Sequence, residues 1–252
     1  MGLAIIGSEP GRGGVGARDR VLDFLPVARE VGVGLAALLT ALSLASVARA
    51  GTVRGQVELL EKGGRKASDL SEVVVYVDGV RAPPRSAHPT TTIAMKGKNF
   101  IPRVVVVPVG GTVEFPNQDS VFHNVFSLSG ENRFDLDLYK RPKSGSWTFQ
   151  HPGLVRIYCN IHPQMSAVVL VRDNPYFTRP GPDGAFVIEE VPAGQYTLRA
   201  WHERAGDVAL ELTVPAQGEV TGRITLDGSK YKREAHKNKF GQDYPAPSHE
   251  TY

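Results

Sequence analysis

Hydrophobic residues recur along this chain in short runs that alternate with turn residues, as they do in β-proteins. After residue 50, runs rich in Val, Thr, Phe and Tyr are separated by clusters of Gly, Pro, Asn and Asp. No stretch after residue 50 shows the spacing of an amphipathic helix, so we predict an all-β fold. The predicted strands cover residues 52–60, 73–77, 90–95, 103–107, 112–115, 124–128, 146–149, 155–159, 167–171, 185–188, 208–214 and 219–226, with one more inside 191–201.

Two polar stretches interrupt this pattern. Residues 130–144 are polar and charged, and we interpret them as a long loop that leaves the fold. Within them, residues 132–142 are a solvated loop in our interpretation, with a role in partner binding as the alternative. Residues 229–252 contain five Lys or Arg and three Asp or Glu. We predict that they form a polar, flexible tail with little structure of its own.

Residues 1–50 have the features of a targeting segment. Residues 31–47 are uncharged and rich in Ala, Leu, Gly and Ser, and Ala48-Arg49-Ala50 supplies a small-x-small cleavage pattern. We predict a signal peptide over 1–50 and no stable membrane insertion of the mature chain, which is then periplasmic or secreted. Residues 1–30 carry four Arg and four acidic residues, so the usual positive excess is missing. A true start codon further downstream is our preferred explanation.

Composition and charge narrow the function classes. Hydrophobic residues make up 41% of the 252 residues and charged residues 22%, which is ordinary for a folded soluble protein. The net charge of +3 is small and no basic stripe is interleaved with aromatic residues, so we predict no nucleic-acid partner. The single cysteine, Cys159, excludes an intramolecular disulfide. A free thiol in an exported protein needs another explanation, either burial as an inert side chain or metal binding.

The residues around this cysteine favour metal binding. Cys159, His162 and Met165 follow one another at intervals of three residues, at the end of a predicted strand. A thiolate, an imidazole and a thioether are soft ligands, and two His, one Cys and a weak axial Met make a blue-copper site. Zinc would accept Cys and His, but its fourth ligand would be another His, Cys or carboxylate. The second histidine comes from elsewhere in the fold, and His123, 36 residues before Cys159, is the candidate.

Each of these residues alone has an ordinary packing role. A lone His is usually a surface residue or a satisfied core residue, and a lone Met or Cys usually fills the core. The joint spacing of all four is what makes copper the better interpretation.

With these motifs, residues 90–171 resemble a cupredoxin, the plastocyanin–amicyanin family of blue copper proteins. Cys-x-x-His-x-x-Met at 159–165 is similar to the short amicyanin ligand loop, and His-Asn-Val at 123–125 also follows the family pattern. The resemblance implies a Greek-key β-sandwich with one type 1 copper ion, in which His123, Cys159 and His162 are equatorial ligands and Met165 is axial. It also implies that Asn124 ties the two ligand segments together by hydrogen bonds. The charged stretch at 132–142 is longer than the family needs.

The strands on either side of the copper unit resemble a second, smaller sandwich. Residues 184–198 are similar to carboxypeptidase regulatory-like (transthyretin-like) domains, which begin with strands such as 52–60 and 73–77. We therefore predict a cupredoxin domain at 90–173 that is inserted in, or packed beside, a small sandwich made of residues 51–80 and 175–228. In the inserted arrangement, strands 52–60 and 73–77 share sheets with strands from residues 185–226.

The chemistry of the four ligands predicts an electron carrier and not an enzyme, because no general base or nucleophile cluster stands out. The resemblance implies that electrons pass through His162, and that the partners are redox proteins such as a c-type cytochrome or a dehydrogenase. Two alternatives are a copper-binding or carrier module without electron transfer and a non-redox adhesion or ligand-binding sandwich. A carrier would more often use Met- and His-rich clusters, and only Met95 and Met165 remain after residue 50.

Overall fold

The computed structural model describes residues 50–81, 89–232 and 235–244. The predicted signal peptide therefore lies outside the described residues, except for its last residue, Ala50, which begins the first strand. None of the described helices is long or apolar enough to cross a membrane.

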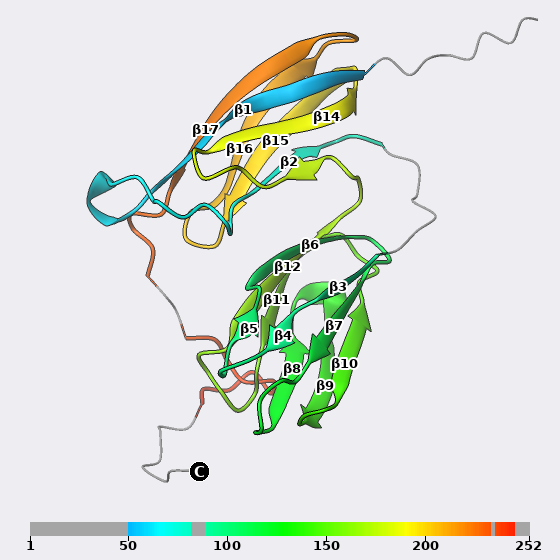
Figure 1. The fold of residues 1–252 in the computed structure, drawn as a ribbon, viewed down its shortest axis with the longest axis vertical. Coiled ribbons are helices and arrows are strands. Elements are labelled where there is room, and N and C mark those ends of the chain that lie inside the picture. The colour runs from blue at the N-terminus through cyan, green and yellow to red at the C-terminus, as the bar shows by residue number, and fades with distance from the viewer. Residues whose placement is uncertain (1–49, 82–88, 233–234, 245–252) are drawn as a thin grey trace, which may run out of the picture. The chain divides into compact units, whose positions relative to one another are not determined.

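The chain is all-β, as predicted, and its described residues contain strands and two short 3₁₀ turns (Figure 1). In chain order the elements are β1 Ala50–Leu60, η1 Lys62–Gly64, β2 Val74–Asp78, β3 Thr90–Thr92, β4 Ala94–Met95, β5 Phe100–Ile101, β6 Val104–Pro108, β7 Thr112–Pro116, β8 His123–Ser127, η2 Gly130–Asn132, β9 Phe134–Tyr139, β10 Ser144–Thr148, β11 Gly153–Tyr158, β12 Ser166–Arg172, β13 Phe177–Thr178, β14 Ala185–Pro192, β15 Gly194–His202, β16 Gly206–Val214 and β17 Glu219–Asp227.

The central sandwich, residues 90–172, contains the sequence motif for copper. Its larger sheet has the strand order β6-β12-β11-β8-β9, and a smaller sheet has the order β10-β7-β3. A two-stranded pair, β4-β5, completes it. Alternate residues of these strands point inward and form one core around Phe100, Phe115, Phe149 and Ile157. Cys159 and Met165 belong to the same core.

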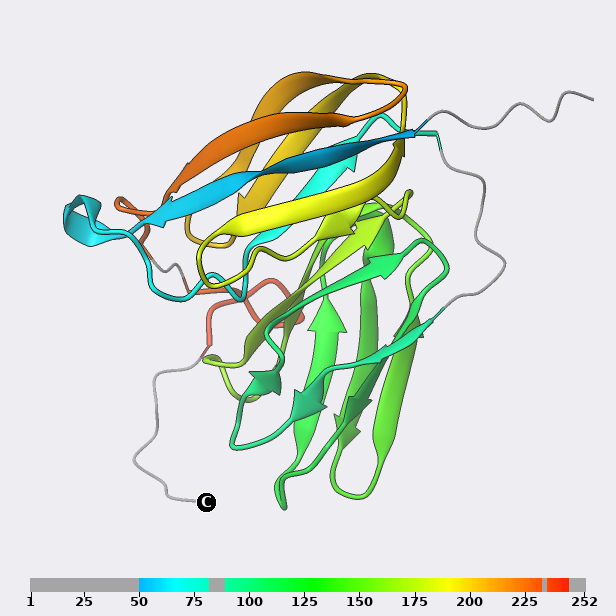
Figure 2. The same cartoon turned by 45° about the horizontal axis from the view of Figure 1, so that its top comes forward.

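The flanking sandwich is formed by strands from both sides of the central one. Strand β1 pairs with β14 and with β17, and β2 pairs with β13 and β15. Figure 2 shows β1 in blue between β14 in yellow and β17 in orange. This sharing of sheets by residues before 90 and after 175 is what the inserted arrangement predicts.

Strands β2 and β12 connect the two sandwiches. Both have continuous apolar runs because both of their faces are buried. In β12, Val169 and Val171 face the core of the central sandwich, whereas Val168 and Leu170 face a separate cluster. That cluster also contains Val74, Tyr76 and Trp201 of the flanking sandwich, together with Val104. Polar contacts border it, including an ion pair from Arg103 Nε to Glu72 Oε1 at 3.0 Å and one between Arg172 and Asp78.

The interpretation of residues 130–144 as a loop is wrong. Phe134–Tyr139 form β9, which pairs with β8 at the edge of the larger sheet. The alternation of Phe134, Leu136 and Leu138 with acidic residues is the two-residue period of a strand, and the charges suit an exposed edge that must not pair with another chain. Phe134 is buried and stacks on Trp147 with ring centroids 4.8 Å apart.

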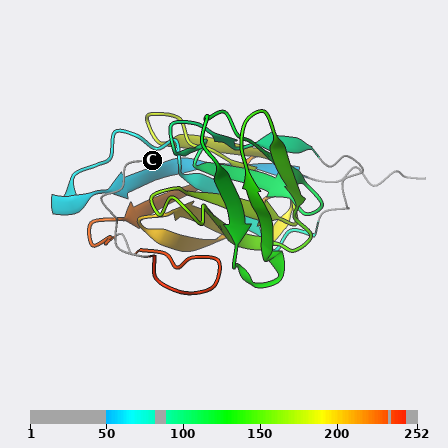
Figure 3. The same cartoon turned by 90° about the horizontal axis from the view of Figure 1, so that it is seen from below.

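The described residues of the tail form no strand or helix and run as an irregular loop, drawn in red in Figure 3. They nevertheless make specific contacts with the central sandwich. Lys239 Nζ lies 2.6 Å from Asp135 Oδ2 on β9, and the Lys239 amide donates to Asn160 Oδ1 at 2.9 Å. Residues 235–244, the tail segment, are thus attached to the residues that follow β11.

Candidate metal centre

Two structural segments bring the candidate ligands together. His123 is the first residue of β8, and Cys159, His162 and Met165 lie on the connection from β11 to β12. In the larger sheet, β8 and β12 lie on opposite sides of β11. A residue at the end of β11 can therefore reach the beginning of β8, which runs antiparallel to it.

The connection, residues 159–165, is closed by its own backbone and is called the ligand loop below. The amide of Cys159 donates to the carbonyl of Met165 at 3.3 Å, and the amide of Met165 donates to the carbonyl of His162 at 2.9 Å. These bonds pull the two ends of the loop together and bring Cys159 and His162, three residues apart, side by side.

Three of the four predicted ligands meet through their donor atoms. His123 Nδ1 lies 3.1 Å from His162 Nδ1, and Cys159 Sγ lies 3.6 Å from His162 Nδ1 and 4.0 Å from His123 Nδ1. Bond lengths of roughly 2.0 Å to nitrogen and 2.3 Å to sulfur, as found for zinc, place three donors in a trigonal plane roughly 3.5 Å apart. The observed triangle fits one metal ion of this size.

The three residues differ in how deeply they are buried. His123 and Cys159 are fully buried, whereas His162 is only partly buried. Met165 is also fully buried, in the core that contains Cys159. The chemistry of this donor set, two imidazoles and a thiolate with a thioether nearby in the chain, suits copper.

The surroundings of Cys159 act in two directions on its thiol. Burial raises the pKa of Cys159, while hydrogen bonds from the backbone amides of Asn124, Ile161 and His162 lower it and leave a net increase. The amides are placed to stabilise a thiolate once a positive ion removes the proton, because a metal-bound thiol is deprotonated. Burial, followed by the charges of His123 and Lys98, lowers the pKa of His162 and favours the neutral imidazole that a metal requires.

The expected role of Asn124 is met by its backbone and not by its side chain. Its amide approaches Cys159, which connects β8 to the ligand loop. The side-chain Nδ2 donates instead to Asp135 Oδ1 at 2.7 Å and to the carbonyl of Asp137 at 2.9 Å, both on β9. Its Oδ1 is buried and has no hydrogen-bond partner among the described residues. The charged stretch at 132–142 therefore supports the first ligand strand through Asn124.

Asp119 is a residue of the site that sequence reasoning missed. Its Oδ2 lies 2.8 Å from His123 Nε2, on the side of the ring away from Cys159. Burial raises the pKa of Asp119, but hydrogen bonds from the amides of Lys98 and Gly97 and from His123 outweigh this and lower the pKa below its usual value. The spacing of four residues between Asp119 and His123, just after a turn, was the available signal.

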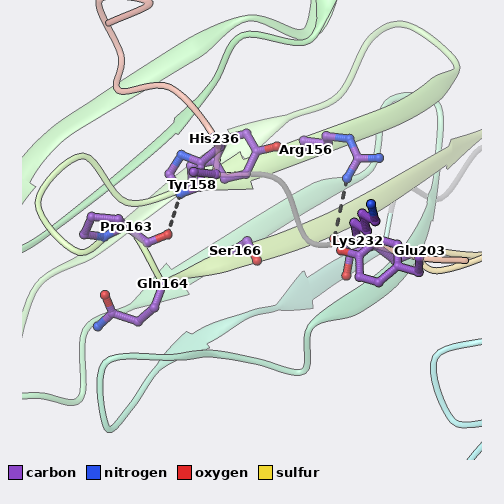
Figure 4. A pocket seen from close by; sticks show the side chains of 10 residues that line it. Arg156, Tyr158, Pro163, Gln164, Ser166, Glu203, Lys232 and His236 are labelled. Atoms are coloured by element: carbon purple, nitrogen blue, oxygen red, sulfur yellow. Dashed lines mark hydrogen bonds and ion pairs between the residues drawn. The ribbon is translucent and has the colours of Figure 1, made fainter. Parts of the chain in front are cut away.

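The tail segment covers one side of the ligand loop, and Figure 4 shows His236 of this segment beside Tyr158 and Pro163. These residues line a cavity of about 670 Å³. The His236 ring stacks on Tyr158 with centroids 3.9 Å apart, and its Nε2 lies 2.8 Å from the carbonyl of Pro163. The Tyr244 hydroxyl donates to the carbonyl of Cys159 at 2.9 Å. Contacts between residues so far apart in the chain have no local sequence signal.

Comparison with known proteins gives cupredoxins among the solved structures. A purple cupredoxin from Nitrosopumilus maritimus is 24% identical, with 32% of this chain and 99% of that chain covered and a TM-score of 0.30. An amicyanin variant in the Cu(I) state is 24% identical over 33% of this chain and 82% of that chain, with a TM-score of 0.31.

A copper-containing nitrite reductase from Thermus scotoductus is 28% identical over 39% of this chain and 26% of that chain, with a TM-score of 0.33. No protein-family model and no curated protein sequence matches the chain. The resemblance of the flanking strands to transthyretin-like domains finds no support here and stays a prediction. Because the TM-scores are low, the interpretation of the site rests on its own geometry.

Proposed function

We propose that this protein is an electron carrier that holds one type 1 copper ion through His123, Cys159, His162 and Met165. The observation that carries the proposal is the triangle of His123 Nδ1, Cys159 Sγ and His162 Nδ1, whose edges measure 3.1, 3.6 and 4.0 Å. Copper bound there supplies one-electron exchange between Cu(I) and Cu(II). The fourth ligand, Met165, is proposed from its place in the ligand loop and its complete burial.

The protein residues hold this geometry in advance, which suits electron transfer because little then has to move. His123 and Cys159 lie in a packed core, and the loop that bears His162 is closed by two backbone hydrogen bonds. We propose a carrier and not an enzyme because the three donor side chains that meet here would all be used to hold the ion.

The partner surface in this proposal surrounds His162. Ile161, directly before it, has 43% of its surface exposed, and Phe122, directly before His123, has 48% exposed. Exposed apolar side chains next to the partly buried ligand suit a transient contact with another redox protein, such as a c-type cytochrome or a dehydrogenase. The proposed location is periplasmic or extracellular, in accordance with the predicted signal peptide.

The test is to add Cu(II) to the purified protein from residue 51 onward and to record its visible spectrum, metal content and reversible reduction. The proposal expects one copper per chain, an intense thiolate-to-copper band, and its loss and return over repeated reduction and oxidation. Binding of copper without that band, or without reversible reduction, would indicate a copper-binding module instead of an electron carrier. Absence of copper binding would leave the non-redox sandwich.

A further inference from the structure

The hydrogen bond between His123 Nε2 and the Asp119 carboxylate lies outside the set of proposed copper ligands. Nδ1 of His123 faces Cys159 and His162, so the proton of the neutral ring belongs on Nε2, where Asp119 Oδ2 accepts it at 2.8 Å. The His123 side chain is fully buried, and that of Asp119 is 16% exposed. The contact is therefore largely shielded from water. An electrostatic interaction is stronger in such surroundings than in water.

The carboxylate of Asp119 is held independently of His123. Its Oδ1 accepts the amide of Gly97 at 2.7 Å, and its Oδ2 accepts the amide of Lys98 at 2.9 Å. Both donors lie in the turn between β4 and β5. Asp119 can thus orient the histidine, because its own position does not depend on that histidine.

A buried asparagine fixes the loop that carries Asp119. Asn117 Oδ1 accepts the Asp119 amide at 2.9 Å, and Asn117 Nδ2 donates to the carbonyls of Val121 and Tyr139 at 3.0 and 2.9 Å. Asn117 is 3% exposed. The hydrogen-bond chain from Asn117 through Asp119 to His123 is complete at every step.

The other histidine has no such support. Among the described residues, no carboxylate lies within ion-pair distance of His162, whose Nδ1 contacts are His123 and Cys159. The two imidazoles therefore differ, because only that of His123 is hydrogen-bonded to a carboxylate.

We propose that Asp119 is a positioning residue that holds His123 as its Nε2–H tautomer and lowers the reduction potential of the bound copper. An anionic acceptor on the far nitrogen makes the imidazole a stronger donor, and it favours the more highly charged Cu(II) over Cu(I). The inference rests on the proposed function for its second half only. The tautomer belongs to the chain with or without metal.

The test compares Asp119→Asn with the wild type, since this change keeps the size and an accepting oxygen but removes the charge. Loss of an outer partner of a ligating histidine typically weakens metal binding 10–100-fold. We expect this loss for Cu(II) and a smaller one for Cu(I). A tenfold difference between the two corresponds to an increase in potential of about 59 mV for a one-electron couple.

Asp137→Asn is the matched control, because it removes an acidic charge from the same sandwich at a side chain that is 88% exposed and contacts Lys239 and no ligand. We expect its potential to stay close to that of the wild type. Equal shifts in the two variants would mean that net charge, and not the bond to His123, sets the potential, and would overturn the proposal. So would an unchanged potential in Asp119→Asn.

The second measurement uses metal-free protein and two-bond ¹H–¹⁵N correlation spectra of the histidine rings. We expect the Nε2–H form of His123 in the wild type and a mixture of tautomers in Asp119→Ala, with folding of the variant verified by its backbone amide spectrum. An Nδ1–H form in the wild type overturns the positioning role. If the wild type bound no copper, the proposed function would fail, while this measurement would still decide whether Asp119 positions His123.

Discussion

The two sides of the metal centre are built differently. On the strand side, His123 begins β8, is fully buried, and is bonded to a carboxylate that is itself held by two backbone amides. On the loop side, residues 159–165 carry three of the four proposed ligands on one short connection, and His162 is only partly buried. The exposed Ile161 next to it brings this side to the surface.

The difference separates two tasks that one site must combine. A fixed, buried ligand with a partly buried charged partner contributes to the electrostatics of the ion, because the interior strengthens such interactions. A ligand near the surface gives an electron a way out to a partner. The strand side is therefore expected to control stability and, through Asp119, part of the potential. The loop side is expected to control colour and electron exchange and, through Met165, the rest of the potential.

The largest effect is expected from the loop side, at Cys159. Replacement of Cys159 by Ser keeps the size but substitutes a hard oxygen for the thiolate sulfur. The visible band should vanish completely, even if a metal still binds, because the band arises from thiolate-to-copper charge transfer. The measurement is the absorption spectrum together with the metal content. An unchanged band in the variant would contradict the assignment of Cys159 as the thiolate ligand. It would also contradict the expectation that the loop side controls the colour.

The two histidines should respond in opposite ways to removal. His162→Gly opens a partly exposed position, so added imidazole should refill it and restore the band, with slower electron exchange than in the wild type. His123→Gly creates a buried cavity and leaves Asp119 without its partner, which should lower the free energy of unfolding by about 2–4 kcal/mol. Imidazole should restore little of the band in this variant.

Denaturant unfolding and imidazole titration of both variants provide the measurement. Equal rescue by imidazole would mean that the strand side is as accessible as the loop side, and the comparison would then be wrong. An Asp183→Asn variant, changed in the flanking sandwich, is a control for the handling of the protein.

Local spacing explains how much of this site could be predicted from the sequence. Cys159, His162 and Met165 sit on one loop, so their relative positions follow from the chain itself. Most of the strands also followed from their hydrophobic pattern, but β9 did not, because its aspartates concealed a two-residue period, and the two-residue strands β5 and β13 were too short to predict. Asp119 could not be assigned from spacing alone because the direction of its side chain depends on amides contributed by the turn between β4 and β5.

The tail shows the limit more clearly. Its composition predicts a polar segment, and the described residues indeed form no strand or helix. The contacts of His236 with Tyr158 and of Tyr244 with Cys159 join residues 78 and 85 positions apart. Nothing in the sequence near either partner encodes such a pair, so only the folded structure brings them together.

A smaller effect is expected at Met165, the proposed axial ligand of the loop side. Met165→Leu conserves volume, so the free energy of unfolding should fall by less than about 1.5 kcal/mol. Copper and its band should remain, and the potential should rise because an electron donor to Cu(II) is lost. Met95→Leu is the matched control, since Met95 is fully buried in the same core. Voltammetry should show the increase in the first variant and not in the second.

The smallest effect is expected from the tail segment, through the hydroxyl of Tyr244. Tyr244→Phe removes the hydrogen bond to the carbonyl of Cys159 and leaves the ring in place, which should destabilise the ligand loop locally by about 1 kcal/mol. The amides of Cys159 and Met165, which close the loop, should then exchange with deuterium about fivefold faster in the metal-free protein. Tyr231→Phe is the control, because Tyr231 is exposed and lines the cavity that His236 of the tail segment also lines. Equal exchange at these amides in both variants and the wild type would show that the tail rests on the loop without stabilising it, and the loop side would then owe its closure to its own backbone alone.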